Sequence, residues 1–319
     1  MGRVPETTLS SGHNMPLLGM GTATFPLPPS ELIESYILAA IEMGYRHFDT
    51  ASVYDTEVPL GRAISEALRR GLVANRDELF ITTKLWCGHA HPDLVVPALH
   101  QSLMEMGLEY VDLYLIHFPA RFNKKEKNFD VKKEEVIPLD MKGTWEAMEE
   151  CSKLGLAKSI GVSNFSCKKL SQLLTYATIP PAVNQVEMHP LWQQWKLREF
   201  CVANDIHVTA YSPLGGKGAL WGSNSVLDSK EIQQMAEAKG KSIAQICLRW
   251  AFEQGVSFIP KSFNVERLKE NMEIFDWEMN KNELLKMSLL PQKRTFTAEY
   301  LVSPDGAFKS VDDLWDGEI

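Results

Sequence analysis

The stretch LFITTKLWCGHAHPDLVVPALHQSLMEMGLEYVDLYLIH, residues 79–117, contains one complete strand–helix–strand unit. Residues 79–84 and 111–117 are short, mainly apolar runs, which predict buried strands. Between them, residues 93–106 repeat apolar side chains at three- and four-residue spacing, which predicts a helix with one buried face. Because a helix connects them, the two strands should pair in parallel through a right-handed crossover.

The same alternation extends on both sides of this unit, from residue 17 to residue 275, and repeats eight times. The predicted strands are Leu17–Gly21, Arg46–Thr50, Leu79–Lys84, Val111–His117, Ser159–Ser163, Val183–Met188, His207–Ser212 and Ser257–Lys261. Predicted helices include Ser30–Met43, Thr56–Arg70, Asp93–Met106, Asp140–Leu154, Ser166–Ala177 and Gln193–Ala203. Eight such repeats either close as a barrel or open as a doubly wound sheet, and the pattern alone fits both.

Two N-terminal segments bear on this choice. Residues Thr7–Leu18 place Ser11-Gly12-His13-Asn14 between short β-like runs, which predicts a hairpin able to plug one end of a barrel. Residues Gly19–Thr24 begin like a dinucleotide-binding fingerprint but lack its third glycine and a following helix start. Without a linker-like change in composition, residues 1–319 are expected to form one domain. We expect long loops at Ala120–Pro138 and after Pro291.

The amino-acid composition limits which partners the protein could bind and in which cell compartment it could work. The formal net charge is -8, which argues against a general affinity for nucleic acid or for an anionic membrane. Residues 1–10 are polar, and no later run has the roughly 18 apolar residues of a membrane span. The 5 cysteines are scattered without a Cys-x-x-Cys pair, which favours a reducing compartment. We therefore expect a cytoplasmic protein that binds neither membrane nor nucleic acid.

Four polar side chains follow the predicted strands at their carboxyl ends. Asp49 ends the second strand, Tyr54 comes five residues later, Lys84 ends the third strand and His117 ends the fourth. Barrel active sites form at this end of the strands. A metal site is not expected at Cys87-x-His89-x-His91, because the sequence offers no convincing further ligands nearby.

These residues lie within blocks that resemble the aldo-keto reductase family along essentially the whole chain. The matching blocks are Gly44–Ala51, Leu79–Trp86, Asp112–His117, Gly161–Phe165, Asn184–Glu187 and Ile259–Asn271. The resemblance implies a (β/α)8 TIM barrel with an N-terminal hairpin and a long C-terminal loop over the active-site face. It also implies a monomeric NADPH-dependent reductase of small-molecule carbonyl compounds, with a catalytic tetrad at Asp49, Tyr54, Lys84 and His117.

The four residue types suit carbonyl reduction. A carbonyl that accepts hydride becomes an alkoxide, and a phenol with a pKa of about 10 is a reluctant proton donor. Tyr54 would supply the proton, while Lys84, held charged by Asp49, would stabilise the tyrosinate. His117 would donate a hydrogen bond to the carbonyl oxygen and fix its direction.

The resemblance also assigns a cofactor site. Ser163, Asn164 and Gln185 would hold the nicotinamide carboxamide, and Tyr211 would stack on its ring. The expected cofactor-binding set also contains Gly21, Thr22, Asp49, Ser212, Leu214, Gly216, Lys261, Ser262, Phe263, Arg267, Glu270 and Asn271. Within it, Asn264 would cap a helix whose start favours an anion, and Lys261, Ser262 and Arg267 would neutralise a ribose 2′-phosphate. That charge predicts a preference for NADPH over NADH.

The expected substrate pocket is aromatic, which suits a bulky, largely apolar carbonyl compound. Its residues are Phe25, Trp86, His117, Phe118, Trp221, Tyr300 and Leu301. Many relatives carry a tryptophan directly after the catalytic histidine, so Phe118 departs from the pattern. Blocks such as Arg76–Leu79, Met148–Cys151, Asn164–Leu170 and Leu314–Asp316 resemble plant enzymes of specialised metabolism, a group that includes codeinone, methylecgonone and chalcone polyketide reductases and deoxymugineic acid synthase.

Several functions remain open on this basis. The expected substrate is an alkaloid ketone of tropane or morphinan type, and the alternatives are a polyketide or a nicotianamine-derived keto acid. A non-catalytic barrel that binds the cofactor and acts through protein contacts is disfavoured by the intact tetrad. A metal-dependent barrel hydrolase would need clustered histidines and carboxylates at several strand ends, where only Asp49 and His117 qualify.

Overall fold

The computed structural model describes residues 3–123, 132–219 and 222–319. Its centre is a sheet of eight parallel strands in the order β12-β11-β10-β9-β6-β5-β4-β3. The strands are β3 (Gly19–Gly21), β4 (His47–Asp49), β5 (Phe80–Leu85), β6 (Val111–Ile116), β9 (Ala157–Ser163), β10 (Val183–Glu187), β11 (His207–Tyr211) and β12 (Ser257–Phe258). Each coincides with a predicted strand to within a few residues.

The sheet closes into a barrel between its first and last strands. Leu18 and Phe258 form a parallel bridge, and the backbone N–H of Phe258 donates to the carbonyl of Leu17 over 2.8 Å. The N–H of Gly21 donates to the carbonyl of Pro260 over 3.2 Å, which continues this seam. The (β/α)8 barrel is therefore confirmed, and the doubly wound sheet is excluded.

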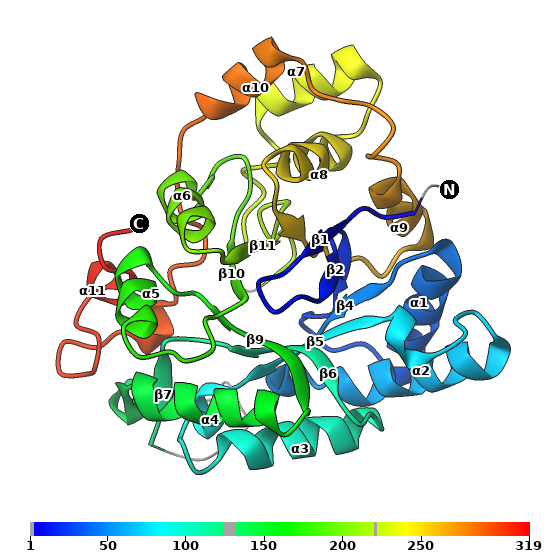
Figure 1. Cartoon of the computed structure of the whole chain (residues 1–319). Helices are drawn as coiled ribbons and strands as arrows, with labels where there is room; N and C mark the ends of the chain where they lie inside the picture. The colour runs from blue at the N-terminus through cyan, green and yellow to red at the C-terminus, as the bar shows by residue number, and fades with distance from the viewer. Residues whose placement is uncertain (1–2, 124–131, 220–221) are drawn as a thin grey trace.

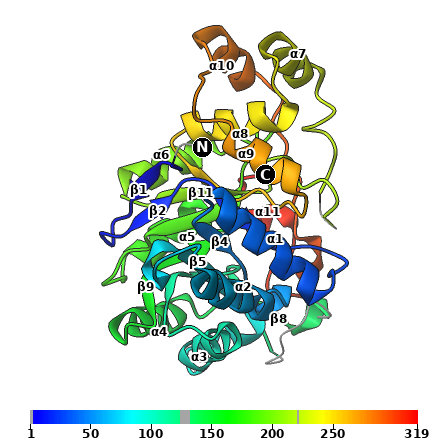
Figure 2. The ribbon, with the colours of Figure 1, turned by 90° about the vertical axis from the view of Figure 1, so that its right-hand side faces the viewer.

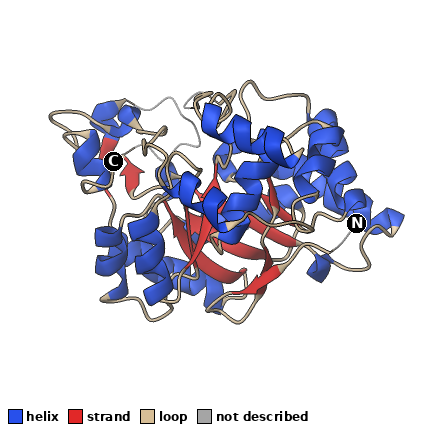
Figure 3. Cartoon of the chain, turned by 90° about the horizontal axis from the view of Figure 1, so that it is seen from above, coloured by secondary structure: helices blue, strands red, loops and turns tan. Residues whose placement is uncertain are grey.

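Helices surround the barrel on its outside (Figures 1 and 3). They are α1 (Ser30–Met43), α2 (Glu57–Arg70), α3 (Val95–Met106), α4 (Met141–Lys153), α5 (Cys167–Leu174), α6 (Trp195–Ala203), α7 (Lys230–Lys239), α8 (Ile243–Glu253), α9 (Val265–Met272), α10 (Lys281–Ser288) and α11 (Val311–Trp315). α9 contacts α1 and completes the ring, whereas α7 and α10 pair outside α8 (Figure 1). Within the described ranges, no helix is long and apolar enough to cross a membrane.

Local sequence signals set where several elements begin and end. α1 ends at Gly44, whose φ of 105° is the left-handed conformation that glycine adopts without steric cost. α9 begins after Asn264, whose side chain accepts a hydrogen bond from the N–H of Arg267, as the sequence predicted. Gly161 allows β9 and β10 to approach, because a Cβ there would lie 2.5 Å from the carbonyl oxygen of Val183.

The N-terminal hairpin covers the amino end of the barrel. Strands β1 (Glu6–Thr8) and β2 (Asn14–Pro16) pair antiparallel, and Ser11 in their turn bonds Ser159 over 2.7 Å. Leu9 and Met15 are buried in one cluster with barrel residues of β5, β6 and β10. Figure 2 shows the hairpin and α11 at opposite ends of the barrel. The predicted plug is therefore confirmed, and the other end carries the C-terminal tail.

Two segments predicted to be long loops contain regular structure. In the stretch 120–138, β7 (Ala120–Phe122) pairs antiparallel with β8 (Val136–Pro138), because buried Phe122 and Val136 pack in the apolar cluster that contains Trp86. The tail after Pro291 contains a short 3-10 turn and α11, which Ser310 caps by accepting from the N–H of Asp313. Short amphipathic pieces like these carry too few residues for a clear period.

Candidate active site

A cavity of about 1010 Å3 opens at the carboxyl end of the barrel strands. Asp49 ends β4, Tyr54 ends the short turn that follows it, Lys84 is the penultimate residue of β5, and His117 follows β6 directly. Parallel strands place their carboxyl ends in one ring, so these side chains meet although they come from separate repeats. Asp49, Tyr54 and His117 line the cavity, and Lys84 is buried behind them.

The four side chains form two linked pairs. The Tyr54 hydroxyl lies 3.1 Å from Nε2 of His117. The Lys84 ammonium donates to Oδ1 of Asp49 over 2.5 Å and to the carbonyl of Thr50 over 2.8 Å. Lys84 Nζ also lies 5.0 Å from the centroid of the Tyr54 ring, which joins the ion pair to the phenol.

Burial shapes the electrostatics of this group. Desolvation, followed by the negative charge of Asp49, raises the pKa of Tyr54 well above its usual value. Desolvation, followed by the positive charge of Lys84, lowers the pKa of His117 well below its usual value. Burial also lowers the pKa of Lys84, against the opposing effect of Asp49. At neutral pH the site therefore contains a protonated phenol beside an uncharged imidazole.

A second set of polar side chains lies next to the tetrad. Gln185 donates to Oδ2 of Asp49 over 2.7 Å, and the Ser163 hydroxyl donates to the Gln185 carbonyl over 2.8 Å. Asn164 has a left-handed backbone with φ of 65°, donates to the carbonyl of His117 and accepts from the hydroxyl of Tyr211 over 2.8 Å. The structure thus brings the three predicted carboxamide-binding residues and the predicted aromatic platform into one network.

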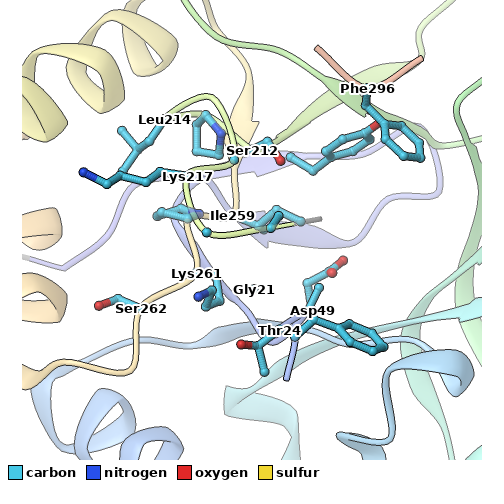
Figure 4. A pocket seen from close by; sticks show the side chains of 18 of the residues that line it. Gly21, Thr24, Asp49, Ser212, Leu214, Lys217, Ile259, Lys261, Ser262 and Phe296 are labelled. Atoms are coloured by element: carbon cyan, nitrogen blue, oxygen red, sulfur yellow. The ribbon is translucent and has the colours of Figure 1, made fainter. Parts of the chain in front are cut away.

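The other arm of the cavity is cationic and rich in glycine. Lys261 and Arg267 line it at the start of α9, and burial together with the charge of Arg267 lowers the pKa of Lys261. The loop after β11 brings backbone close to the cavity, and Gly216 adopts a φ of 71° that other residues rarely take. Figure 4 shows Lys217 and Ser262 on one side of the cavity and Asp49 and Phe296 on the other.

Every other predicted cofactor residue except Thr22 lines this cavity: Gly21, Ser212, Leu214, Phe263, Glu270 and Asn271. Thr22 is buried outside the lining, because its hydroxyl bonds the carbonyl of Asp49 and the hydroxyl of Thr56. The structure therefore shows these internal hydrogen bonds for Thr22, and its predicted role in cofactor binding stays a prediction.

Four of the residues predicted to form a substrate pocket give this cavity aromatic walls. Phe25, Trp86, Phe118 and Tyr300 line it. Leu301 does not, because consecutive residues of a 3-10 turn point in different directions, and it packs behind the wall in the cluster that contains Leu314 and Trp315. The predicted wall residue Trp221 lies outside the described residues.

Phe296 is a lining residue that sequence reasoning missed. Its ring lies 5.7 Å from that of Phe118 and 6.4 Å from that of Tyr211. The tail contains several aromatic residues, and nothing in their spacing distinguishes Phe296 from those that pack elsewhere. Phe296 reaches the cavity only because the folded tail crosses the barrel at this point.

A model of the aldo/keto reductase family matches residues 17–288. The chain is 54% identical over 317 residues to 7-acetyl-epi-neemfruitin B aldo-keto reductase of Melia azedarach, covering 99% of this chain and 98% of that protein. It is 54% identical over 313 residues to NADPH-dependent codeinone reductase 1-4 of Papaver somniferum, covering 98% of each. Both likenesses span the barrel and the tail.

Among solved structures, the chain is similar to an aldo-keto reductase of Bombyx mori in complex with NADP. The TM-score is 0.84 at 36% sequence identity, and the superposition covers 94% of this chain and 97% of that one. The likeness therefore extends to the arrangement of the whole barrel.

Proposed function

The chain belongs to the aldo/keto reductase family and is an NADP-dependent oxidoreductase, and we propose that it reduces a ketone or aldehyde with Tyr54 as the proton donor. The observation that carries this proposal is the placement of the Tyr54 hydroxyl 3.1 Å from Nε2 of His117, above the buried Lys84–Asp49 pair. The phenol oxygen and one imidazole nitrogen thus lie side by side at the wall of the cavity.

The cavity fits NADPH on its own chemistry. Its cationic arm at the start of α9 suits the phosphates, because a helix N-terminus with adjacent Lys261 and Arg267 favours anions. Ser163, Asn164 and Gln185 present the amide and hydroxyl groups that would hold the carboxamide, beside the ring of Tyr211. The bound cofactor supplies the hydride.

Side chains of the protein orient the carbonyl group and supply its proton. A carbonyl oxygen between the Tyr54 hydroxyl and Nε2 of His117 would receive hydrogen bonds from both, which directs its carbon into the cavity. The uncharged imidazole orients the oxygen without competing as an acid. When the phenol gives up its proton, the nearby charge of Lys84 stabilises the tyrosinate, and Asp49 keeps that lysine charged.

The test is the oxidation of NADPH in the presence of carbonyl compounds. Tyr54→Phe should lower kcat by roughly 10²–10⁴-fold, the usual contribution of a general acid, while the affinity for NADPH measured by fluorescence titration stays unchanged. Tyr114→Phe is the control, because Tyr114 is a buried tyrosine of β6 that does not line the cavity. Full activity of Tyr54→Phe would refute the mechanism. Tight NADPH binding without turnover of any compound would favour a cofactor-binding protein that acts through contacts.

For the substrate, we infer an alkaloid ketone of tropane or morphinan type. The aromatic walls Trp86, Phe118 and Phe296 suit a bulky polycyclic compound, and the relative from Papaver somniferum is named for codeinone. A keto acid fits less well, because within the described lining the cationic side chains Lys217, Lys261 and Arg267 belong to the cofactor arm. Since the equally identical relative from Melia azedarach is named for another compound, a panel of tropane, morphinan, polyketide and keto-acid substrates must decide.

We further infer a single-domain monomer in the cytoplasm. One apolar core cluster contains residues from Val4 to Leu290, which supports one domain. All 5 cysteines are free thiols, as a reducing compartment requires. Light scattering of the purified protein tests the oligomeric state, and cell fractionation tests the location.

A further inference from the structure

The C-terminal tail contributes a wall of the active site through one side chain. The ring of Phe296 lies 5.7 Å from Phe118, 6.4 Å from Tyr211 and 6.5 Å from Tyr300, all of which line the cavity. Phe296 therefore spans the boundary between the proposed substrate side and the proposed nicotinamide platform.

A buried carboxylate of the barrel holds the backbone at this point. Glu187 is the last residue of β10 and its side chain is 1% exposed. Its Oε2 accepts from the N–H of Phe296 over 2.9 Å, and both of its oxygens lie 3.2 Å from the N–H of Thr295. His189 Nε2 lies 3.2 Å from Oε1. The tail thus supplies two of the three groups that hydrogen-bond this carboxylate in the described part of the chain.

Through these hydrogen bonds the tail stabilises the buried charge of Glu187, and Glu187 holds the tail in place. In the described ranges, no Lys or Arg nitrogen lies within ion-pair distance of Glu187, so its direct hydrogen-bond partners are the two backbone N–H groups and the imidazole of His189. A buried carboxylate without hydrogen bonds is strongly unfavourable, which ties residues 295 and 296 to the end of β10. Arg294 makes its own direct contacts, 3.7 Å over the ring of Trp315 and with the carbonyl of Glu318, and its charge is also felt by Glu187.

We propose that Glu187 is a positioning residue that fixes Phe296 as a wall of the substrate side and thereby sets the selectivity for bulky carbonyl compounds. Glu187 does not itself line the cavity, so it acts through the tail. The kinetic consequence rests on the proposed reductase function. The attachment of the tail to Glu187 does not depend on that function, and it can be measured without any enzymatic turnover.

The first test is Glu187→Gln, assayed with propanal and with the best polycyclic ketone of the substrate panel. Glutamine has the same shape, but its NH2 group would face the backbone N–H donors. We expect the KM for the ketone to rise on the order of tenfold from the loss of a charge-assisted hydrogen bond. Propanal is too small to need this wall, so its kcat and KM should stay within about twofold.

The matched control is Glu149→Gln on the outer face of the barrel. Glu149 is also a buried carboxylate that accepts from two consecutive backbone N–H groups, those of Thr178 at 2.7 Å and Ile179 at 2.9 Å, but it lies away from the cavity. It should lower stability without changing the ratio of the two KM values. An unchanged ratio in Glu187→Gln, or an equal rise in Glu149→Gln, would overturn the proposal.

A second measurement is limited trypsin digestion, with cleavage sites found by mass spectrometry. Release of residues 295 and 296 should speed cleavage after Lys293 or Arg294 in Glu187→Gln relative to both wild type and Glu149→Gln. Unchanged cleavage would overturn the anchoring role even if no substrate were turned over. If Glu187→Gln fails to fold, Glu187→Asp, which keeps the charge but shortens the reach, serves in both assays with the same criteria.

A double-mutant cycle connects Glu187 to Phe296. Phe296→Ala should reproduce the rise in KM for the ketone, and adding Glu187→Gln to it should raise KM little further, because the wall is already absent. Independent, multiplying effects would show that Glu187 acts by another route and would overturn the proposal.

Discussion

Replacing Asp49 with Asn should reveal the cost of burying Lys84. Their side chains are 3% and 1% exposed, and the carboxylate contacts the ammonium over 2.5 Å. Asparagine keeps one acceptor oxygen but removes the countercharge, so Lys84 would retain only neutral partners such as the carbonyl of Thr50 at 2.8 Å. Removing one partner of a buried ion pair typically costs about 3–5 kcal/mol. We expect Asp49→Asn to lower the free energy of unfolding by that amount.

Adding Lys84→Met to Asp49→Asn should recover most of this loss. The double variant contains no buried charge at this place, and replacement of a buried pair by apolar groups is often close to neutral. Urea unfolding followed by tryptophan fluorescence measures both variants without NADPH, since bound ligand would add its own stabilisation. Asp77→Asn is the control, because the Asp77 carboxylate of its pair with Lys158 is 73% exposed and should contribute less than about 1 kcal/mol. A double variant less stable than the single one would refute the reasoning.

Three further predictions follow from the same structure. Burial lowers the pKa values of His47 and His117, so below about pH 6.5 the unfolded chain binds protons that the folded chain does not. Urea titrations at decreasing pH should therefore show the free energy of unfolding falling by up to about 1.4 kcal/mol per pH unit for each histidine. Lys261→Ala and Arg267→Ala should each weaken NADPH binding on the order of tenfold and leave NADH binding nearly unchanged, as measured by fluorescence titration. An equal loss for both nucleotides would contradict a 2′-phosphate contact. Gly161→Ala should destabilise the barrel by about 1–3 kcal/mol or more, because its Cβ would lie 2.5 Å from a backbone oxygen of β10, and a normal melting temperature would count against this packing.

The conservative change Phe118→Trp offers a further view of the pocket. The Phe118 ring stacks on that of His117 at 5.5 Å and lies 5.7 Å from that of Phe296, so a larger indole would press on the tail. The residue type at position 118 is therefore linked to Phe296 of the tail through this ring contact, and a comparison of sequences at position 118 alone does not identify that link.

Periodicity and local signals were sufficient for the secondary structure. The helix Ser30–Met43 was predicted with the bounds it has, because its apolar period is uninterrupted and Gly44 ends it. All eight barrel strands were predicted, since each apolar run is short and is separated from the next by a helical period. The paired strands β7 and β8 were missed, because they flank a Lys-rich stretch and stand outside the regular alternation of strands and helices.

The residue types at the strand ends were readable from the sequence, and their assembly into one site was not. Asp49, Lys84 and His117 could be placed at strand ends, but the pattern of repeats fitted both an open sheet and a barrel. The bridge between Leu18 and Phe258 decides this, and it joins segments at opposite ends of the pattern. Such a contact depends on the accumulated twist of the whole sheet, which no local sequence window contains.

The eight repeats, their strand ends and the types of chemically active side chains could be predicted from the amino-acid sequence, because they depend on local period and residue type. Tertiary structure alone decided that Thr22 and Leu301 face away from the cavity and that Phe296 enters it. Those outcomes depend on rotations within single turns and on the anchoring of the tail to Glu187, more than 100 residues earlier in the chain. Contacts between distant segments are set by the packing of the complete fold, and the order of residues does not display them.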